Sequence, residues 1–109
     1  MAYSQELAER IRAALAHLPN VEEKKMFGRL MFFVNGKMCL TAGPEQIMCR
    51  LNPELHEQKV KRKGCSTVIM RGRKYKGYIY VKEENLRTES DFKHWIDLAL
   101  EFNEKLTAE

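Results

Sequence analysis

The chain has 109 residues, of which 44% are hydrophobic and 31% are charged, and its formal net charge is +4. These values predict one globular domain over residues 1–109 and exclude a disordered chain. The longest apolar run, residues 30–34, excludes a membrane-spanning helix, and residues 1–10 carry charges where a signal peptide would be apolar.

The first predicted element is a helix from residue 4 to about residue 18. Apolar side chains such as Leu7 and Ile11 recur there at three- and four-residue steps, which gives one apolar stripe. Ser4 is suited to cap the first turn, since its hydroxyl can accept from a free backbone N–H. Pro19 and Asn20 end the helix.

Residues 26–51 predict a β-meander. A first strand is expected over residues 22–27, and Gly28-Arg29 is either a tight turn or a kink within one long strand. Strands over residues 30–34 and 37–41 are joined by Asn35-Gly36, the strongest short-range hairpin signal. A loop through Gly43-Pro44 leads to a further strand over residues 46–51.

The hairpin turn predicts a register. A two-residue turn pairs Phe33 with Met38, and further along it pairs Phe32 with Cys39 and Met31 with Leu40. A following turn centred on Pro44 places Cys39 opposite Cys49 and Leu40 opposite Met48. With this register, one face would carry Leu30, Phe32, Cys39, Ile47 and Cys49. The other would carry Met31, Phe33, Met38, Leu40 and Met48.

Both predicted faces are apolar, whereas a sheet with one face in water alternates apolar and polar residues. Helices of the same chain can cover one face. The other face needs a folded-over segment, a ligand or a partner, which is either another protein or a second copy in a homodimer. The candidate partner interface therefore consists of Met31, Phe33, Met38 and Met48.

The second half of the chain predicts a helix over residues 53–63, capped by Asn52 and stopped by Gly64. Strands follow over residues 67–70 and 78–81, joined by a basic loop between glycines. Thr88 begins the last helix, whose apolar stripe is a core stripe: Phe92, Trp95, Ile96, Ala99, Phe102 and Leu106. The fold class is α+β, an antiparallel sheet of five to six strands with three helices in the order α-β(3-4)-α-β2-α.

Several short patterns run nearly from end to end of the chain: Lys25-Met26-Phe27-Gly28, Asn35-Gly36-Lys37-Met38, Met48-Cys49-Arg50, Lys76-Gly77-Tyr78, and Trp95 with Phe102-Asn103. They resemble the TfoX/Sxy N-terminal domain family, in particular its short stand-alone members without the C-terminal helical domain. The resemblance implies a secretion-chaperone-like α+β fold and a link to regulation of transcription and natural competence. It implies no catalytic residues.

One segment produces the positive charge of the chain. Between residues 59 and 76 there are eight basic side chains and no acidic one: Lys59, Lys61, Arg62, Lys63, Arg71, Arg73, Lys74 and Lys76. Beside Tyr75, Tyr78 and Tyr80 they could bind a nucleic acid or another anion, with phosphates on the cations and bases on the rings. The alternative is a helix end and a loop that are simply solvated, and the modest total charge favours it.

No catalytic or metal-binding arrangement can be assembled from the remaining residues, so we expect a binding protein rather than an enzyme, with no cofactor. Cys39 and Cys49 could be a redox pair, but small buried reduced side chains are the preferred interpretation. His17, His56 and His94 are expected to be surface histidines. The three cysteines fit no zinc spacing and indicate a reduced, cytoplasmic protein.

Overall fold

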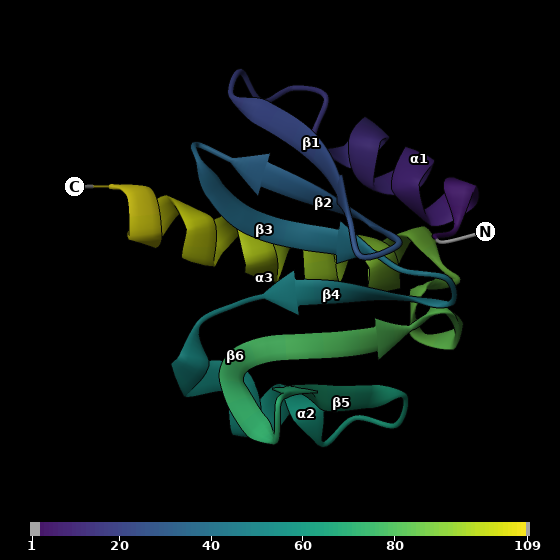
Figure 1. The fold of residues 1–109 in the computed structure, drawn as a ribbon, viewed down its shortest axis with the longest axis vertical. Helices are drawn as coiled ribbons and strands as arrows, with labels where there is room; N and C mark the ends of the chain where they lie inside the picture. Colours follow the sequence, from purple (N-terminus) through teal and green to yellow (C-terminus); the bar gives the residue numbers. More distant parts are fainter. Residues whose placement is uncertain (1–2, 109) are drawn as a thin grey trace.

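The computed structural model describes residues 3–108 and has the α+β architecture expected from the sequence (Figure 1). Within these residues a six-stranded antiparallel sheet has the order β1-β2-β3-β4-β6-β5. Its strands are β1 (Val21–Met26), β2 (Arg29–Val34), β3 (Lys37–Ala42), β4 (Gln46–Arg50), β5 (Cys65–Met70) and β6 (Arg73–Lys82). The described α-helices are α1 (Gln5–Ala14), α2 (His56–Val60) and α3 (Glu89–Thr107), and 3-10 turns cover Pro53–Leu55 and Glu83–Leu86.

The predicted helix starts are confirmed by their hydrogen bonds. Ser4 Oγ accepts from the N–H of Leu7 at 3.1 Å, and Thr88 Oγ1 accepts from that of Asp91 at 3.0 Å. The ends differ from the expectation. Helix α1 ends at Ala14, before the proline. The predicted helix 53–63 is a 3-10 turn followed by the short α2.

Three hairpins close on the same kind of turn. Both central residues of each turn have positive φ, which is type I′ geometry and matches the right-handed twist of the strands. The turns are Phe27-Gly28, Asn35-Gly36 and Arg71-Gly72. The open question at residue 28 is therefore answered: the chain turns at Phe27-Gly28, and β1 and β2 are separate strands. The predicted basic loop is also shorter, since residues 73–76 belong to β6.

The predicted register is wrong beyond the second pair of the β2–β3 hairpin. Phe33 pairs with Met38 as expected, but Phe32 then pairs with Leu40, so Cys39 is an extra residue in a β-bulge. The predicted β3–β4 pairing is also wrong by one residue: Leu40, not Cys39, lies opposite Cys49, and Thr41 lies opposite Met48. The bulge moves Leu40 to the face that α1 and α3 cover, where it is fully buried.

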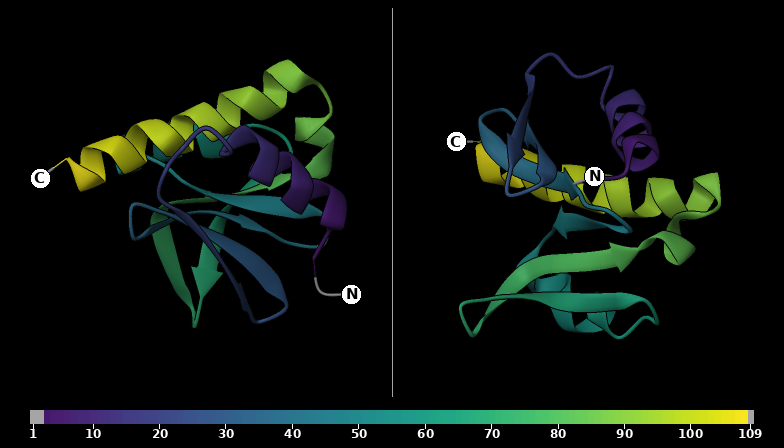
Figure 2. Two further views of the ribbon diagram at one scale, coloured as in Figure 1. Left: turned by 90° about the horizontal axis from the view of Figure 1, so that it is seen from above. Right: turned by 45° about the vertical axis from the view of Figure 1, so that its right-hand side comes forward.

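The core lies between that face and the helices. Helix α3 crosses the sheet and α1 lies beside it on the same side (Figure 2). Trp95 of α3 is 1% exposed, which confirms the predicted core stripe. Buried Asn103 ties α3 to the sheet, since its side-chain amide donates to the carbonyl oxygen of Val34 at 3.0 Å.

Candidate interaction face

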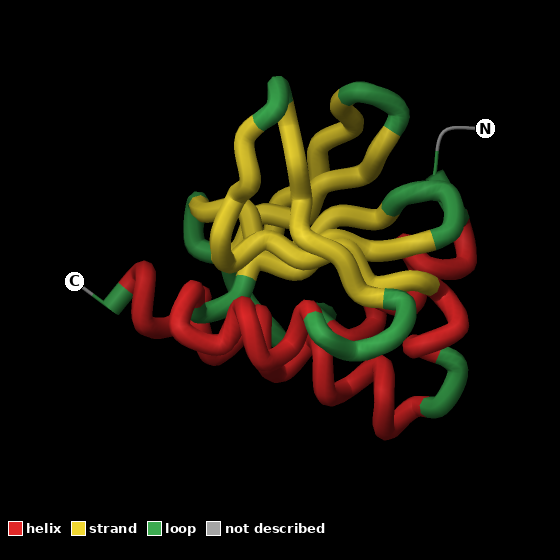
Figure 3. The backbone as a smooth tube through the Cα atoms, turned by 90° about the horizontal axis from the view of Figure 1, so that it is seen from below, coloured by secondary structure: helices red, strands yellow, loops and turns green. Residues whose placement is uncertain are grey.

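The face of the sheet opposite α1 and α3, here called the open face, carries no helix within residues 3–108 (Figure 3). Residues paired across an antiparallel sheet share a face, so the register identifies its members. The pairs run across the middle of the sheet: Phe33–Met38, Met31–Thr41, Thr41–Met48, Met48–Tyr80 and Arg50–Tyr78. Met31, Phe33, Met38 and Met48 thus lie together on this face. Leu40, which was expected with them, does not.

Long flexible side chains fill the open face. Alternation along β5 from Ser66, which pairs with Tyr80, places Met70 on this face, and Met26 pairs with Arg29 on the same side. Every methionine of the described residues therefore lies here: Met26, Met31, Met38, Met48 and Met70. In the middle of the face, Thr41 is 2% exposed and Met48 9%. Neighbouring side chains shield them, as the contact of 3.7 Å between Thr41 Oγ1 and Met38 Sδ shows.

Two hairpins rise at the borders of the open face. In two views the β1–β2 and β5–β6 turns project away from α3, on the same side of the molecule (Figures 2 and 3). The exposed large hydrophobic residues of the described chain sit at these two tips. They are Met26, Phe27, Ile69 and Met70, and Phe27 is 91% exposed. Exposed apolar groups of this kind, next to a partly apolar face, are typical of contact surfaces.

Cations lie over the aromatic rings of the open face. The Nζ of Lys24 is 5.0 Å from the ring centre of Phe33, and the guanidinium of Arg29 is 5.5 Å from that of Tyr80. Arg50 lies 5.4 Å from the ring centre of Tyr78. These are cation–π distances, each worth about 0.5–1 kcal/mol at an exposed site. Phe33 and Tyr80 therefore have a cation close to their rings. Arg50 is different, because its guanidinium also lies 5.8 Å from the ring centre of Phe102 on α3.

The predicted basic segment does not form one patch. Lys61, Arg62 and Lys63 precede β5, whereas Arg71 and Arg73 follow it, so a strand of six residues separates them by roughly 20 Å at ~3.3 Å per residue. The first group lies beside α3, where Lys59 Nζ is 3.5 Å from His94 Nε2. The second group, with Lys74 and Lys76, is on the β5–β6 hairpin. Within the described residues none of the eight forms an ion pair.

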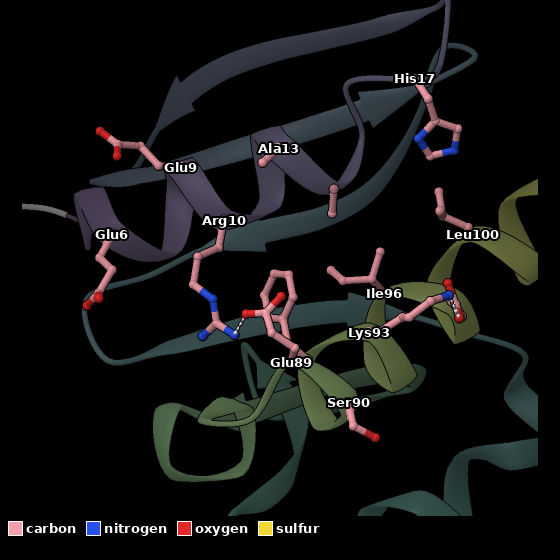
Figure 4. Close-up of a pocket in the computed structure, with 13 residues that line it drawn as sticks. Glu6, Glu9, Arg10, Ala13, His17, Glu89, Ser90, Lys93, Ile96 and Leu100 are labelled. Atoms are coloured by element: carbon pink, nitrogen blue, oxygen red, sulfur yellow. Dashed lines mark hydrogen bonds and ion pairs between the residues drawn. The ribbon is translucent and has the colours of Figure 1, made fainter.

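A second concave site, not expected from the sequence, lies between α1 and α3 (Figure 4). It is a groove of about 850 Å³ with an apolar floor that includes Phe92, Ile96 and Leu100. Two of its cations are paired: Arg10 Nη2 is 3.4 Å from Glu89 Oε1, and Lys93 Nζ is 2.8 Å from Asp97 Oδ2. Glu6, Glu9 and His17 line the same groove, and none of them forms an ion pair within the described residues. The two predicted helices could have suggested such a groove only if their spacing on the sheet had been known.

His56 is not a surface histidine, as was expected, but is 3% exposed. Its Nδ1 accepts from the N–H of Gly77 at 2.9 Å, and its Nε2 lies 2.9 Å from Thr67 Oγ1. Because Nδ1 accepts, the ring proton is on Nε2, which donates to Thr67. Both nitrogens are therefore used in joining α2 to β5 and β6.

The cysteines are free thiols. Burial raises the pKa of the Cys39 thiol to about 12 and the pKa of Cys49 well above its usual range. Burial also raises the pKa of Cys65, against the opposing hydrogen bond from Asn85. Since the thiolate is the nucleophile and metal ligand, these side chains have the properties of inert core residues. Within residues 3–108, no three His, Cys, Asp or Glu side chains are grouped closely enough for a metal ion.

The fold and this face define an α+β domain whose antiparallel sheet is covered by helices on one side only. The sequence model of the TfoX N-terminal domain matches residues 13–103, and the chain belongs to that family. Neither a curated protein nor a solved structure matches the chain. The expected likeness to secretion chaperones therefore stays a prediction. Over residues 3–108, none of the helices is long and apolar enough to cross a membrane.

Proposed function

We propose that this protein is a cytoplasmic, non-enzymatic regulatory module that acts by binding another protein through the open face of its sheet. The observation that carries the proposal is the gathering of all described methionines on that one face. Methionine has three rotatable bonds and a polarisable sulfur, so a surface rich in it can adapt its shape to a partner. The family membership supports a role in transcriptional regulation and natural competence.

The geometry of the open face favours a binding role over catalysis. Three of its cations, Lys24, Arg29 and Arg50, lie close to aromatic rings. In the α1–α3 groove, both cations are paired with carboxylates, and His56 is occupied by Thr67 and Gly77. A general base must be within hydrogen-bonding reach of its substrate, and both ring nitrogens of His56 are already used in hydrogen bonds.

Site-specific photo-crosslinking in cells tests this proposal. A benzoyl-phenylalanine residue at Phe33, which is partly exposed on the open face, should give adducts with a protein. The same residue at exposed Glu104 of α3 is the matched control and should give none of these adducts. Identical adduct patterns at both positions, or no protein adduct at Phe33, would refute the proposal.

A second copy of this chain is one possible partner, as a homodimer through the open face. Light scattering after size-exclusion chromatography distinguishes a homodimer from a protein that binds a different partner. A dimer that Phe33→Glu converts to monomer would identify the partner as self, whereas a monomer at high concentration would leave a different protein.

Nucleic-acid binding is the second candidate function, and one observation favours it. Tyr78 and Tyr80 lie on the side of β6 opposite the buried Ile79 and Val81, and their rings are close to Arg50 and Arg29. Rings with nearby cations can stack bases and hold phosphates. A mobility shift at low salt that is lost when Arg71, Arg73, Lys74 and Lys76 are changed to Ser would support this function. No shift at low salt would exclude it.

A further inference from the structure

We infer that the open face, bordered by its two hairpin tips, binds an acidic segment of another protein, with Phe27 as its apolar anchor. The inference rests on the proposed function and names the chemistry of the partner. Two independent observations carry it: the sign of the charge around the open face, and the backbone conformation at Phe27.

The charge of the open face is one-sided. The strands place five basic side chains on it, namely Lys24, Arg29, Arg50, Arg73 and Lys82. The carboxylate that the described strands place there is that of Glu22, paired with Phe33 at the edge of the sheet. The rest of the chain holds 14 basic and 14 acidic residues in total, and seven of those basic ones lie in residues 59–76. A complementary partner is therefore negatively charged and carries apolar groups for the methionines and rings.

Phe27 occupies a strained backbone position, as Arg71 does in the β5–β6 turn. It has φ +53° in the Phe27-Gly28 turn, a left-handed conformation that is unfavourable for residues other than Gly, Asn or Asp. The Asn35-Gly36 turn has the same geometry and uses the residue that tolerates it. The Phe27 ring is 91% exposed, so burial in this chain does not compensate for the strain. Strain of this kind, maintained at an exposed apolar side chain, indicates a contact residue.

The position of Phe27 fits the charge argument. It sits between Met26 and Arg29 on the hairpin that borders the open face, and Arg29 reaches the ring of Tyr80 near the centre of that face. The opposite border carries Met70 next to Arg71 and Arg73. Both borders thus combine an exposed apolar side chain with a cation. An extended or helical segment that alternates apolar and acidic residues could contact the apolar side chain and the cation at each border.

The test measures, by fluorescence anisotropy, how tightly the full chain binds a synthetic peptide that alternates Leu with Asp and Glu. Its matched counterpart replaces the acids with Lys. Binding of the acidic peptide, and at least tenfold weaker binding of the basic one, is the expected result. Equal binding of the two, or no binding of the acidic peptide, would overturn the inference.

Variants then locate the binding site. Arg29→Glu should weaken peptide binding about tenfold or more, whereas Lys105→Glu, with the same change in charge on exposed α3, should leave it unchanged. Phe27→Asn should act in opposite directions on two readouts. It relieves the left-handed strain and raises Tm by about 4–8 °C, yet it weakens peptide binding about tenfold. Stabilisation with unchanged binding would show that Phe27 is not an anchor.

Oligothymidylate in the same anisotropy assay tests whether the partner is a nucleic acid instead of an acidic protein segment. If it binds more tightly than the acidic peptide and loses affinity in Arg29→Glu, the partner is a nucleic acid and the inference is overturned. The proposed function is decided by the crosslinking experiment, independently of peptide binding. Protein adducts at Phe33 without binding of the acidic peptide would leave the proposed function standing and remove only the acidic partner.

Discussion

Replacing His56 by alanine should destabilise the protein through one backbone donor. In the structure the N–H of Gly77 donates to His56 Nδ1 at 2.9 Å, and Gly77 is buried. At this point the pairing of β6 with β5 is interrupted. Val68 of β5 pairs with Tyr75 and Thr67 pairs with Ile79, so residues 76–78 have no partner on β5. The imidazole takes the place of the missing strand partner.

The size of the effect follows from what alanine leaves behind. A buried N–H without an acceptor costs about 1–3 kcal/mol, and the space left by a ring that is 3% exposed adds a cavity term. We expect His56→Ala to lower the free energy of unfolding by about 2–4 kcal/mol. For a domain of this size that corresponds to a fall in Tm of roughly 8–30 °C.

Urea unfolding followed by the fluorescence of Trp95 measures this loss, because Trp95 is the single tryptophan and is 1% exposed. His17→Ala is the matched control, since His17 is exposed, and it should change stability by less than about 0.5 kcal/mol. A loss below about 1 kcal/mol for His56→Ala would refute the reasoning, because the Gly77 N–H would then have another acceptor.

Three further predictions concern the core, the thiols and one ion pair. Trp95→Ala should lower the free energy of unfolding by about 3–5 kcal/mol in urea titrations followed by circular dichroism; a loss under about 1 kcal/mol would contradict its place in the core. Cys39 and Cys49 should react with a thiol reagent only in denaturant, since burial raises the pKa of both; rapid labelling of the native protein would contradict this. Arg12 contacts Glu23 through two hydrogen bonds of 2.6 and 2.8 Å, which lower the pKa of Glu23 and raise that of Arg12. A double-mutant cycle should give a coupling of at most about 1 kcal/mol at neutral pH, because both side chains are partly exposed. The coupling should disappear as the pH falls through the lowered pKa of Glu23, and a coupling that persists in acid would count against the ion pair.

Local features of this fold could be predicted because nearby residues determine them. Ser4 and Thr88 cap their helices through bonds that span three residues, and Asn35-Gly36 turns the chain whatever lies beyond it. The stripe containing Trp95 follows from helical spacing alone. These features gave the element order, the fold class and the side of α3 that is buried.

Features that depend on distant parts of the chain could not be predicted. Nothing near His56 shows that the N–H of Gly77, 21 residues away, lacks a strand partner. The bulge at Cys39 is of the same kind, because Met38, Cys39 and Leu40 are all apolar and either register buries apolar groups. The choice depends on packing: the bulge buries Leu40 fully under α1 and α3. The groove between α1 and α3 depends in the same way on how the helices are spaced on the sheet.

The open face was nevertheless identified almost correctly from a wrong register, and the reason is physical. The predicted β3–β4 pairing is wrong by one residue, which alone would turn Met48 to the covered side. The bulge at Cys39 adds one residue to β3, and the two shifts cancel, so Met48 still shares a face with Met31. Only Leu40, which follows the bulge on its own strand, changes sides. The placement of Met48 therefore depended on two errors that cancel, whereas no second error compensated for the bulge at Leu40.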